Sequence, residues 1–168
     1  YEKHREFIKA GDPFYSRNLT QTGLDFRPDV QQAWESAGVE TEQMKVTGYR
    51  TAEVTLQMSV DSIDYRVSDA YGNEDFYEFR GWVLKKGMSE AGVEPAVLIV
   101  NNGRRFVYRA VRVFRKDVQK GCMAGFVSRI AAKAVEAQNI EGKCEIFPVL
   151  IKGRKIYKGE NGCQTEMI

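Results

Sequence analysis

The sequence contains few of the residues that staple a small protein together or bind a metal. Cysteines occur only at positions 122, 144 and 163, without a CxxC pair, and His4 is the single histidine. An odd set of cysteines argues against a secreted disulfide framework and favours a reducing, intracellular compartment. Because none of these residues has the paired spacing of a zinc site, we expect no metal.

Long apolar runs are absent as well. The longest, Ile146 to Ile151, is far shorter than the roughly 20 residues that a membrane helix needs. The first residues also lack the charged, apolar and small-residue segments of a signal peptide. The composition, with 43% hydrophobic and 29% charged residues, is typical of a globular domain, and 168 residues can bury enough surface to fold without staples. We therefore expect a cytoplasmic protein that does not contact membranes.

Motifs for catalysis or for nucleotide cofactors are not found. Cys122 has no general base near it, since His4 lies in the least regular part of the chain. Six acidic residues cluster between Asp61 and Glu78, but three of them, at positions 69, 74 and 75, fall at a predicted turn. Asp64 and Glu78 stay conceivable as a pair of catalytic carboxylates, although solvated charges are the favoured interpretation. The glycines between 81 and 92 fit neither the dinucleotide fingerprint nor the Walker pattern. We expect no catalytic residue and no cofactor, and an enzyme ranks third among the functions considered.

The strongest signal is an uneven charge distribution behind the net charge of +2. Residues 1–103 contain 11 basic and 17 acidic residues, whereas residues 104–133 contain 9 basic residues and 1 acidic residue. A block this basic indicates a polyanion partner, because Lys and Arg replace the counterions of phosphates. It is equally compatible with a contact to the acidic half, inside the fold or across a subunit contact.

Alternating apolar residues predict a mainly antiparallel sheet of five to seven strands. The expected strands are 51–60, 63–67, 76–84, 96–100, 105–114, 144–151 and 154–158. A parity change after Asp61-Ser62 calls for a turn or a bulge. Asn101-Asn102-Gly103-Arg104 contains the Asn-Gly pair of a two-residue hairpin turn, and Lys152-Gly153 predicts a second hairpin. Connections this short favour antiparallel neighbours, and they would also allow an OB-like barrel.

A long helix is predicted after the strand 105–114. Asp117 can cap it, and its apolar residues recur at three- and four-residue spacing, as in a stripe that packs on a sheet. These apolar residues are Val118, Met123, Phe126, Val127, Ile130, Ala131 and Ala134. Gly121 and Gly125 lower the helix propensity and indicate a close approach to the sheet. The predicted fold class is therefore α+β, a mainly antiparallel β-sheet with one long amphipathic helix packed on it.

The first 45 residues differ from the rest of the chain. Glycine and proline turn signals punctuate them, and no strand-like alternation occurs. Pro28 can open a short helix that ends at Gly38. We expect an N-terminal arm over residues 1–45 and a single α+β domain over residues 46–168. Phe14 and Trp34 in the arm need a surface to cover them, which predicts a homo-oligomer. The arm could instead fold back onto its own sheet.

The basic strand suggests a binding surface. Between Arg105 and Arg115 one face is mostly aromatic and suits a core, while the other mixes guanidinium groups with valines. Charges for phosphates and flat rings for bases are what sheet-based binders of single strands use. The predicted nucleic-acid-binding residues are Arg104, Arg105, Arg109, Arg112, Arg115, Lys116, Lys120, Tyr77 and Phe79. The leading hypothesis is a non-enzymatic protein that binds single-stranded RNA or DNA, or another polyanion, through residues 104–133.

The alternative hypothesis is a structural, self-assembling subunit, such as a viral or phage particle component. In that case the arm reaches a neighbouring copy, and the basic segment meets the acidic half of that copy. Arginine mixed with apolar residues suits a subunit interface.

Overall fold

The computed structural model describes residues 38–67, 74–88, 92–115, 117–118 and 123–167, which belong to one compact unit of residues 37–168. The short helix expected to begin at Pro28, together with Phe14 and Trp34, lies outside the described residues. Residues 38–45, assigned to the arm by their sequence pattern, are part of this unit. No helix within the described ranges is long and apolar enough to cross a membrane.

The fold consists of two facing β-sheets, and the prediction of an α+β fold with a long helix is wrong. Strands make up 60% of the described residues and helix only 5%. Sheet A has the strand order β1-β8-β4-β3, and β7 also pairs with β8. Its strands are β1 (Val39–Glu40), β3 (Gln57–Arg66), β4 (Phe76–Leu84), β7 (Val111–Val113) and β8 (Gly125–Ala131).

Sheet B has the order β2-β10-β9-β5-β6, and β11 also pairs with β9. Its strands are β2 (Arg50–Glu53), β5 (Val93–Asn101), β6 (Arg104–Arg109), β9 (Gly142–Lys152), β10 (Lys155–Lys158) and β11 (Cys163–Met167). Most pairs are antiparallel, as predicted, but β1 runs parallel to β8 and β2 runs parallel to β10. Both sheets are therefore mixed.

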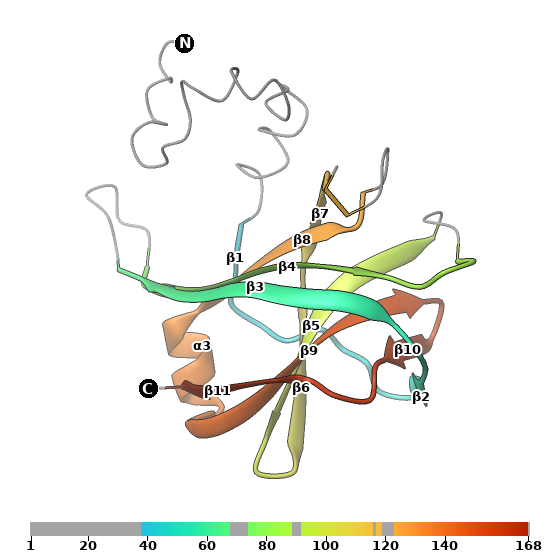
Figure 1. Ribbon diagram of the computed structural model, residues 1–168. Coiled ribbons are helices and arrows are strands. Elements are labelled where there is room, and N and C mark those ends of the chain that lie inside the picture. Colours follow the sequence, from blue (N-terminus) through green and yellow to red (C-terminus); the bar gives the residue numbers. More distant parts are fainter. Residues whose placement is uncertain (1–37, 68–73, 89–91, 116, 119–122, 168) are drawn as a thin grey trace, which may run out of the picture. The chain divides into compact units, whose positions relative to one another are not determined.

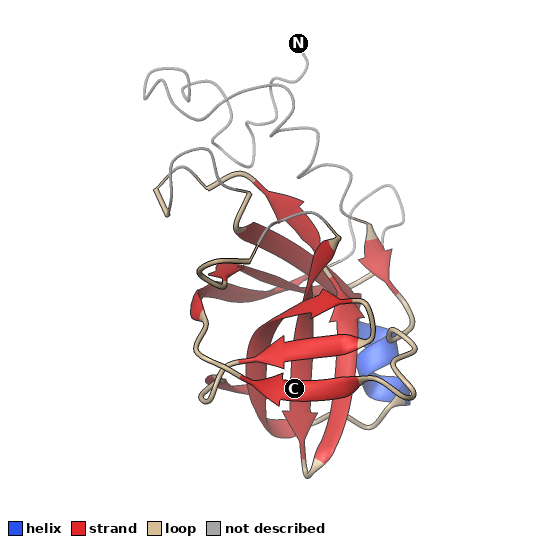
Figure 2. Ribbon diagram, turned by 90° about the vertical axis from the view of Figure 1, so that its right-hand side faces the viewer, coloured by secondary structure: helices blue, strands red, loops and turns tan. Residues whose placement is uncertain are grey.

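At two places the chain passes from sheet B to sheet A through a very short connection (Figure 1, Figure 2). The edge strand β6 continues into β7 of sheet A through the buried Ala110. The opposite edge strand, β2, continues into β3 through residues 54–56, and this splits the predicted strand 51–60 in two. The Val54 N–H donates to the Lys158 carbonyl at 2.8 Å and holds this crossing on sheet B.

Two apolar clusters form the core. The first lies between the sheets, and its largest buried rings are Phe79, Tyr108 and Phe126. The second lies on the other face of sheet B, where Met44, Val46 and Tyr49 pack against Leu98, Val107, Phe147 and their neighbours. Sheet B is thus covered on both faces, which explains how β6 carries the buried Val107 as well as exposed arginines.

The predicted helix after Asp117 is replaced by strand β8 and the six-residue helix α3 (Ala132–Ala137). Six of the seven β8 residues are buried, so its apolar residues occupy both faces and show no alternation. Such a run cannot be told from a helix by its period. The glycine at position 125 reflects the close pairing of β8 with β7, because a Cβ atom there would lie only 2.9 Å from the Val113 carbonyl oxygen of β7.

Several local predictions are confirmed. The strand Phe76–Leu84 has the predicted bounds, and the register between β3 and β4 shifts between Val60 and Ser62. In the β5–β6 hairpin, Asn102 and Gly103 form the two-residue turn with φ of 51° and 77°. Positive φ at both positions is the conformation for which Asn-Gly is preferred.

Candidate functional site

Much of the basic segment between Arg104 and Lys133 has acidic partners within the same chain. Four of its residues form ion pairs with acids of the N-terminal half: Arg109 with Glu94, Arg115 with Asp61, Arg129 with Glu78 and Lys133 with Glu74. Arg115 also binds Asp117, with 2.8 Å between Nη2 and Oδ2. The charge asymmetry of the sequence is therefore partly compensated inside the fold.

Two further arginines of this segment bind backbone carbonyl groups. Arg104 donates to the carbonyl oxygens of Gln138 and Asn139, both at 2.7 Å, at the C-terminal end of α3. Arg112 donates to Met123 at 2.8 Å and to Val93 at 2.6 Å. Both guanidinium groups tie together segments that are distant in sequence.

We expect Arg112→Ala to lower the free energy of unfolding by about 2 kcal/mol, because two carbonyl groups lose a charged donor. Equilibrium urea unfolding measures the change. Arg105→Ala is the control: the side chain of Arg105 is exposed and makes no polar contact with another described residue, so its removal should change stability by less than about 0.5 kcal/mol. Equal midpoints for the two variants would contradict a structural role for Arg112.

The predicted aromatic residues lie inside the protein rather than on an open face. Tyr77 is 6% exposed and Phe79 is fully buried, because their face of β4 points to the first core cluster. Phe76 and Trp82, of opposite parity, are half-buried on the outer face. Lys116 and Lys120 lie outside the described residues. The seven predicted residues that the structure describes therefore do not gather on one surface.

The outer face of sheet A instead carries a buried carboxylate surrounded by guanidinium groups. Glu78 is 3% exposed and accepts hydrogen bonds from Arg129 at 2.8 Å, Arg80 at 3.0 Å and Arg66 at 3.2 Å. Burial by itself would raise the pKa of Glu78, but the hydrogen bonds from Arg80 and Arg129 outweigh it and lower the pKa to about 2. Glu78 is ionised at neutral pH and is a poor general base.

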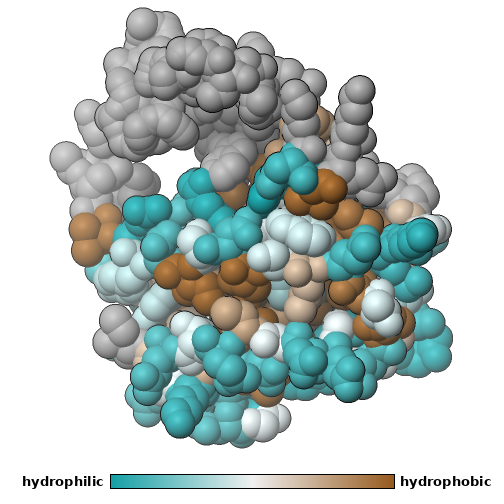
Figure 3. Space-filling model, in the orientation of Figure 1, coloured by the Kyte–Doolittle hydropathy of each residue, from teal (hydrophilic) through white to brown (hydrophobic). Residues whose placement is uncertain are grey.

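A different group of basic residues lies where the β9–β10 turn meets the start of β2. We call it the basic corner and define it as Lys45, Arg50, Lys152, Arg154 and Lys155. Lys155 is paired in register with Lys152 on one side and with Arg50 on the other. Three cations thus form a row across three neighbouring strands, at a strand spacing of about 4.8 Å. In Figure 3, hydrophilic and apolar surface lie side by side along the edge where β2 and β10 lie.

The basic corner has no acidic compensation in the described part of the chain. None of its five residues forms an ion pair there, and all are exposed except the half-buried Lys155. Like charges directly opposite one another on a sheet are destabilising. A local arrangement that costs stability without an internal gain is typical of a functional site.

Aromatic rings lie next to these cations. The guanidinium carbon of Arg154 lies 5.7 Å from the ring centroid of Tyr49, and Lys155 Nζ lies 5.3 Å from that of Tyr157. The Arg50 N–H donates to the Arg154 carbonyl at 3.0 Å, which fixes the turn against β2. The corner therefore combines positive charge with a half-buried ring on an ordered scaffold.

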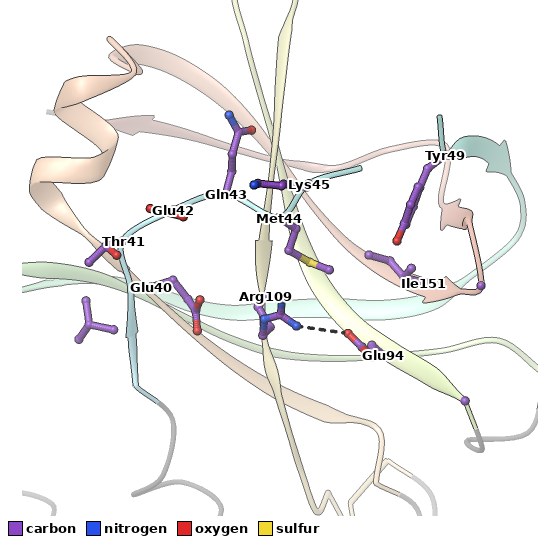
Figure 4. Close-up of a pocket in the computed structure, with 13 residues that line it drawn as sticks. Glu40, Thr41, Glu42, Gln43, Met44, Lys45, Tyr49, Glu94, Arg109 and Ile151 are labelled. Atoms are coloured by element: carbon purple, nitrogen blue, oxygen red, sulfur yellow. Dashed lines mark ion pairs between the residues drawn. The ribbon is translucent and has the colours of Figure 1, made fainter. Parts of the chain in front are cut away.

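A pocket of about 630 Å³ adjoins the basic corner (Figure 4). Its walls include Lys45, Tyr49 and Gly153 from the side of the corner, and Glu94 and Arg109 from β5 and β6. The Arg109 Nη1 to Glu94 Oε1 distance is 3.8 Å. The pocket thus borders the corner at Lys45 and beside Arg154. The row of Lys152, Lys155 and Arg50 lies on the opposite face of sheet B, because Lys152 and Lys155 alternate with Ile151 and Ile156 of the second core cluster.

The sequence signal for the corner is weak. Lys152-Gly153-Arg154-Lys155 is a short basic run, but it lies in a block, residues 134–168, whose 5 basic residues are matched by 5 acidic ones. Arg50 joins it only through the parallel pairing of β2 with β10. No local sequence pattern predicts a pairing between strands about 100 residues apart in the chain.

Within the described residues, no group of three or more histidine, cysteine or acidic side chains could hold a metal ion. No family model matches the chain, and comparisons with curated proteins and with solved structures find no similar protein. Function therefore has to be inferred from the chemistry of the surface itself.

Proposed function

We propose that this is a non-enzymatic binding protein whose basic corner contacts the phosphates of single-stranded nucleic acid. The observation that supports the proposal is the row formed by Lys152, Lys155 and Arg50, three like charges in register without an acidic partner in the described structure. Phosphates bound across this row would relieve the repulsion between its members. Neutralising phosphates also releases their counterions, which favours binding.

The ring of Tyr49 favours a single strand over other polyanions. Unpaired bases stack on aromatic side chains, and arginine adds a cation–π contact, as in the Arg154–Tyr49 pair. The bases of a duplex are stacked inside the helix and would leave Tyr49 without a role. A polyanion without bases, such as a sulfated polysaccharide, would bind the corner but gain nothing from the ring.

The alternative of a self-assembling subunit receives less support from the described residues. This alternative requires the basic segment to form ion pairs with acidic residues of a neighbouring copy. Four residues of the segment already form ion pairs within one chain, with Asp61, Glu74, Glu78 and Glu94. Self-association through the N-terminal arm stays a prediction. Cys144 and Cys163 are free thiols, which supports our inference of an intracellular, reducing compartment.

The double variant Arg50→Gln/Lys155→Gln tests the proposal. With a labelled oligonucleotide of about 8 residues, we expect about 20-fold weaker binding in about 0.1 M salt. The slope of log affinity against log salt should fall by about 1.4, since each contact to a single strand contributes about 0.7. Stability should stay the same or rise slightly, because two like charges are removed from neighbouring strands. Fluorescence anisotropy and urea unfolding on the same preparations measure both.

The double variant Arg105→Gln/Lys143→Gln is the matched control. It removes the same charge from exposed residues of sheet B. Lys143 and Lys152 lie nine residues apart on β9, about 30 Å by strand rise. We expect its affinity to remain within about twofold of the parent. A parent protein without measurable affinity, or an equal loss in both double variants, would show that the basic corner is not the binding surface.

A further inference from the structure

We infer that the pocket beside the basic corner receives a nucleobase that carries an exocyclic amino group, with cytosine preferred over uracil. This inference rests on the proposed function and adds base selectivity to it. It concerns the pocket between the 39–45 segment, Tyr49 and the β5–β6 edge of sheet B (Figure 4).

The position of the pocket supports this assignment. Lys45 and Tyr49 line the pocket, while the ring of Tyr49 lies under Arg154 of the basic corner. A strand whose phosphates contact Lys45 and Arg154 of the corner therefore has a base within reach of the pocket. The volume of about 630 Å³ is within the range of sites that enclose small ligands, about 300–1,000 Å³.

The charges of the pocket direct the base inward and the phosphates outward. Its walls carry three acidic residues, Glu40, Glu42 and Glu94, against the two basic residues Lys45 and Arg109. This surface disfavours a phosphate, whereas the neighbouring corner attracts one. Tyr49, Met44 and Ile151 also line the pocket and supply the apolar contact that a base needs on its faces (Figure 4).

Glu94 and Arg109 supply the hydrogen-bonding groups that distinguish one base from another. Their ion pair is long, at 3.8 Å, and the two side chains are 59% and 53% exposed, so the pair is weak and both groups can turn to a ligand. A carboxylate accepts a hydrogen bond from the cytosine amino group. The guanidinium group beside it donates to the acceptors at N3 and O2 of the same base. Uracil has a carbonyl oxygen in place of the amino group, and this oxygen would face the Glu94 carboxylate.

Two RNA oligomers of about 8 residues, one of cytidine and one of uridine, test the inference in fluorescence anisotropy titrations. We expect the parent protein to bind the cytidine oligomer about 10-fold more tightly, because a specific base contact is worth about 1–3 kcal/mol. Glu94→Gln should reduce the preference to less than about twofold and raise the affinity for the uridine oligomer, because the amide no longer repels the uracil carbonyl oxygen and can donate to it. Urea unfolding shows whether the variant is folded. Glu166→Gln, an exposed acid on β11, is the control and should keep the full preference.

The outcomes separate this inference from the proposed function. Equal binding of both oligomers by the parent, with weaker binding by Arg50→Gln/Lys155→Gln, would overturn the base selectivity and leave the proposed function intact. A cytidine preference that survives Glu94→Gln would overturn the assignment to this pocket. Absence of binding to either oligomer would overturn the proposed function, and the inference with it.

Discussion

Replacing Glu78 with Gln should lower the free energy of unfolding by about 4 kcal/mol at neutral pH, within the roughly 3–5 kcal/mol typical of a broken buried ion pair. Glu78 is 3% exposed and accepts hydrogen bonds from Arg66, Arg80 and Arg129. Glutamine removes the negative charge and leaves the guanidinium groups crowded together without compensation. Urea unfolding followed by circular dichroism measures the loss.

Glu53→Gln is the matched control for this prediction. Glu53 also binds a cation, with 3.3 Å between its Oε2 and Lys158 Nζ, but its side chain is 61% exposed. Exposed pairs contribute about 0–1 kcal/mol, so we expect little change. Similar effects of the two substitutions would contradict the view that burial makes the Glu78 cluster important.

The pH dependence of stability gives an independent measurement of the same cluster. The pKa of Glu78 is lowered from 4.5 to about 2 in the folded protein, so its contribution is complete above about pH 4.5 and is lost as the pH falls through about 2. At about 1.4 kcal/mol per pKa unit, the contribution is about 3 kcal/mol. The difference in stability between the parent and Glu78→Gln should therefore shrink by about 2 kcal/mol between pH 7 and about pH 3. A constant difference over this range would show that Glu78 has an ordinary pKa.

A second large effect is expected at Gly81 of β4, which is paired with Val60 of β3. A Cβ atom on Gly81 would overlap the carbonyl oxygen of Ser59 and lie 3.1 Å from the ring of Phe126. Neither neighbour can yield easily, because one is backbone and the other is 1% exposed in the core. We expect Gly81→Ala to destabilise the protein by about 3 kcal/mol, at the upper end of the usual cost of overpacking.

Gly38→Ala is the control for the Gly81 substitution. A Cβ atom on Gly38 would meet no atom within 4 Å, so the midpoint of thermal or urea unfolding should hardly change. Equal unfolding midpoints for the two alanine variants would mean that β3 and β4 can move apart at Gly81 without a loss of stability, which would contradict the prediction.

The sequence predicts those features of the fold that depend on neighbouring residues. The Asn102-Gly103 turn follows from the preference of both residues for positive φ, and the bulge at Val60–Ser62 follows from a change in apolar parity. The bounds of β4 follow from alternation. Each of these signals is contained in about ten consecutive residues.

Features that depend on distant segments are not predictable in the same way. On β4, aromatic residues occupy both parities, Phe76 and Trp82 on one face and Tyr77 and Phe79 on the other. The alternation therefore does not show which face of β4 is buried, because that depends on which face packs against sheet B. The same limitation applies to β8, whose two buried faces remove the alternation. For the candidate site, the basic run at 152–155 is visible in the sequence, but the strand pairing that places it next to Arg50 is not.

The parallel pairing of β2 with β10 has a consequence for the order of folding. It brings Arg50 beside Lys155, so the chain must close a loop of about 100 residues before these strands can meet. Non-local contacts of this kind slow folding, because the entropy of loop closure is lost before the contacts form. The row of cations across β9, β10 and β2 therefore does not exist on a growing chain until β10 has been synthesised. A ribosome-bound chain that ends before residue 150 should lack the proposed binding surface, even where the β3–β4 and β5–β6 hairpins have already formed.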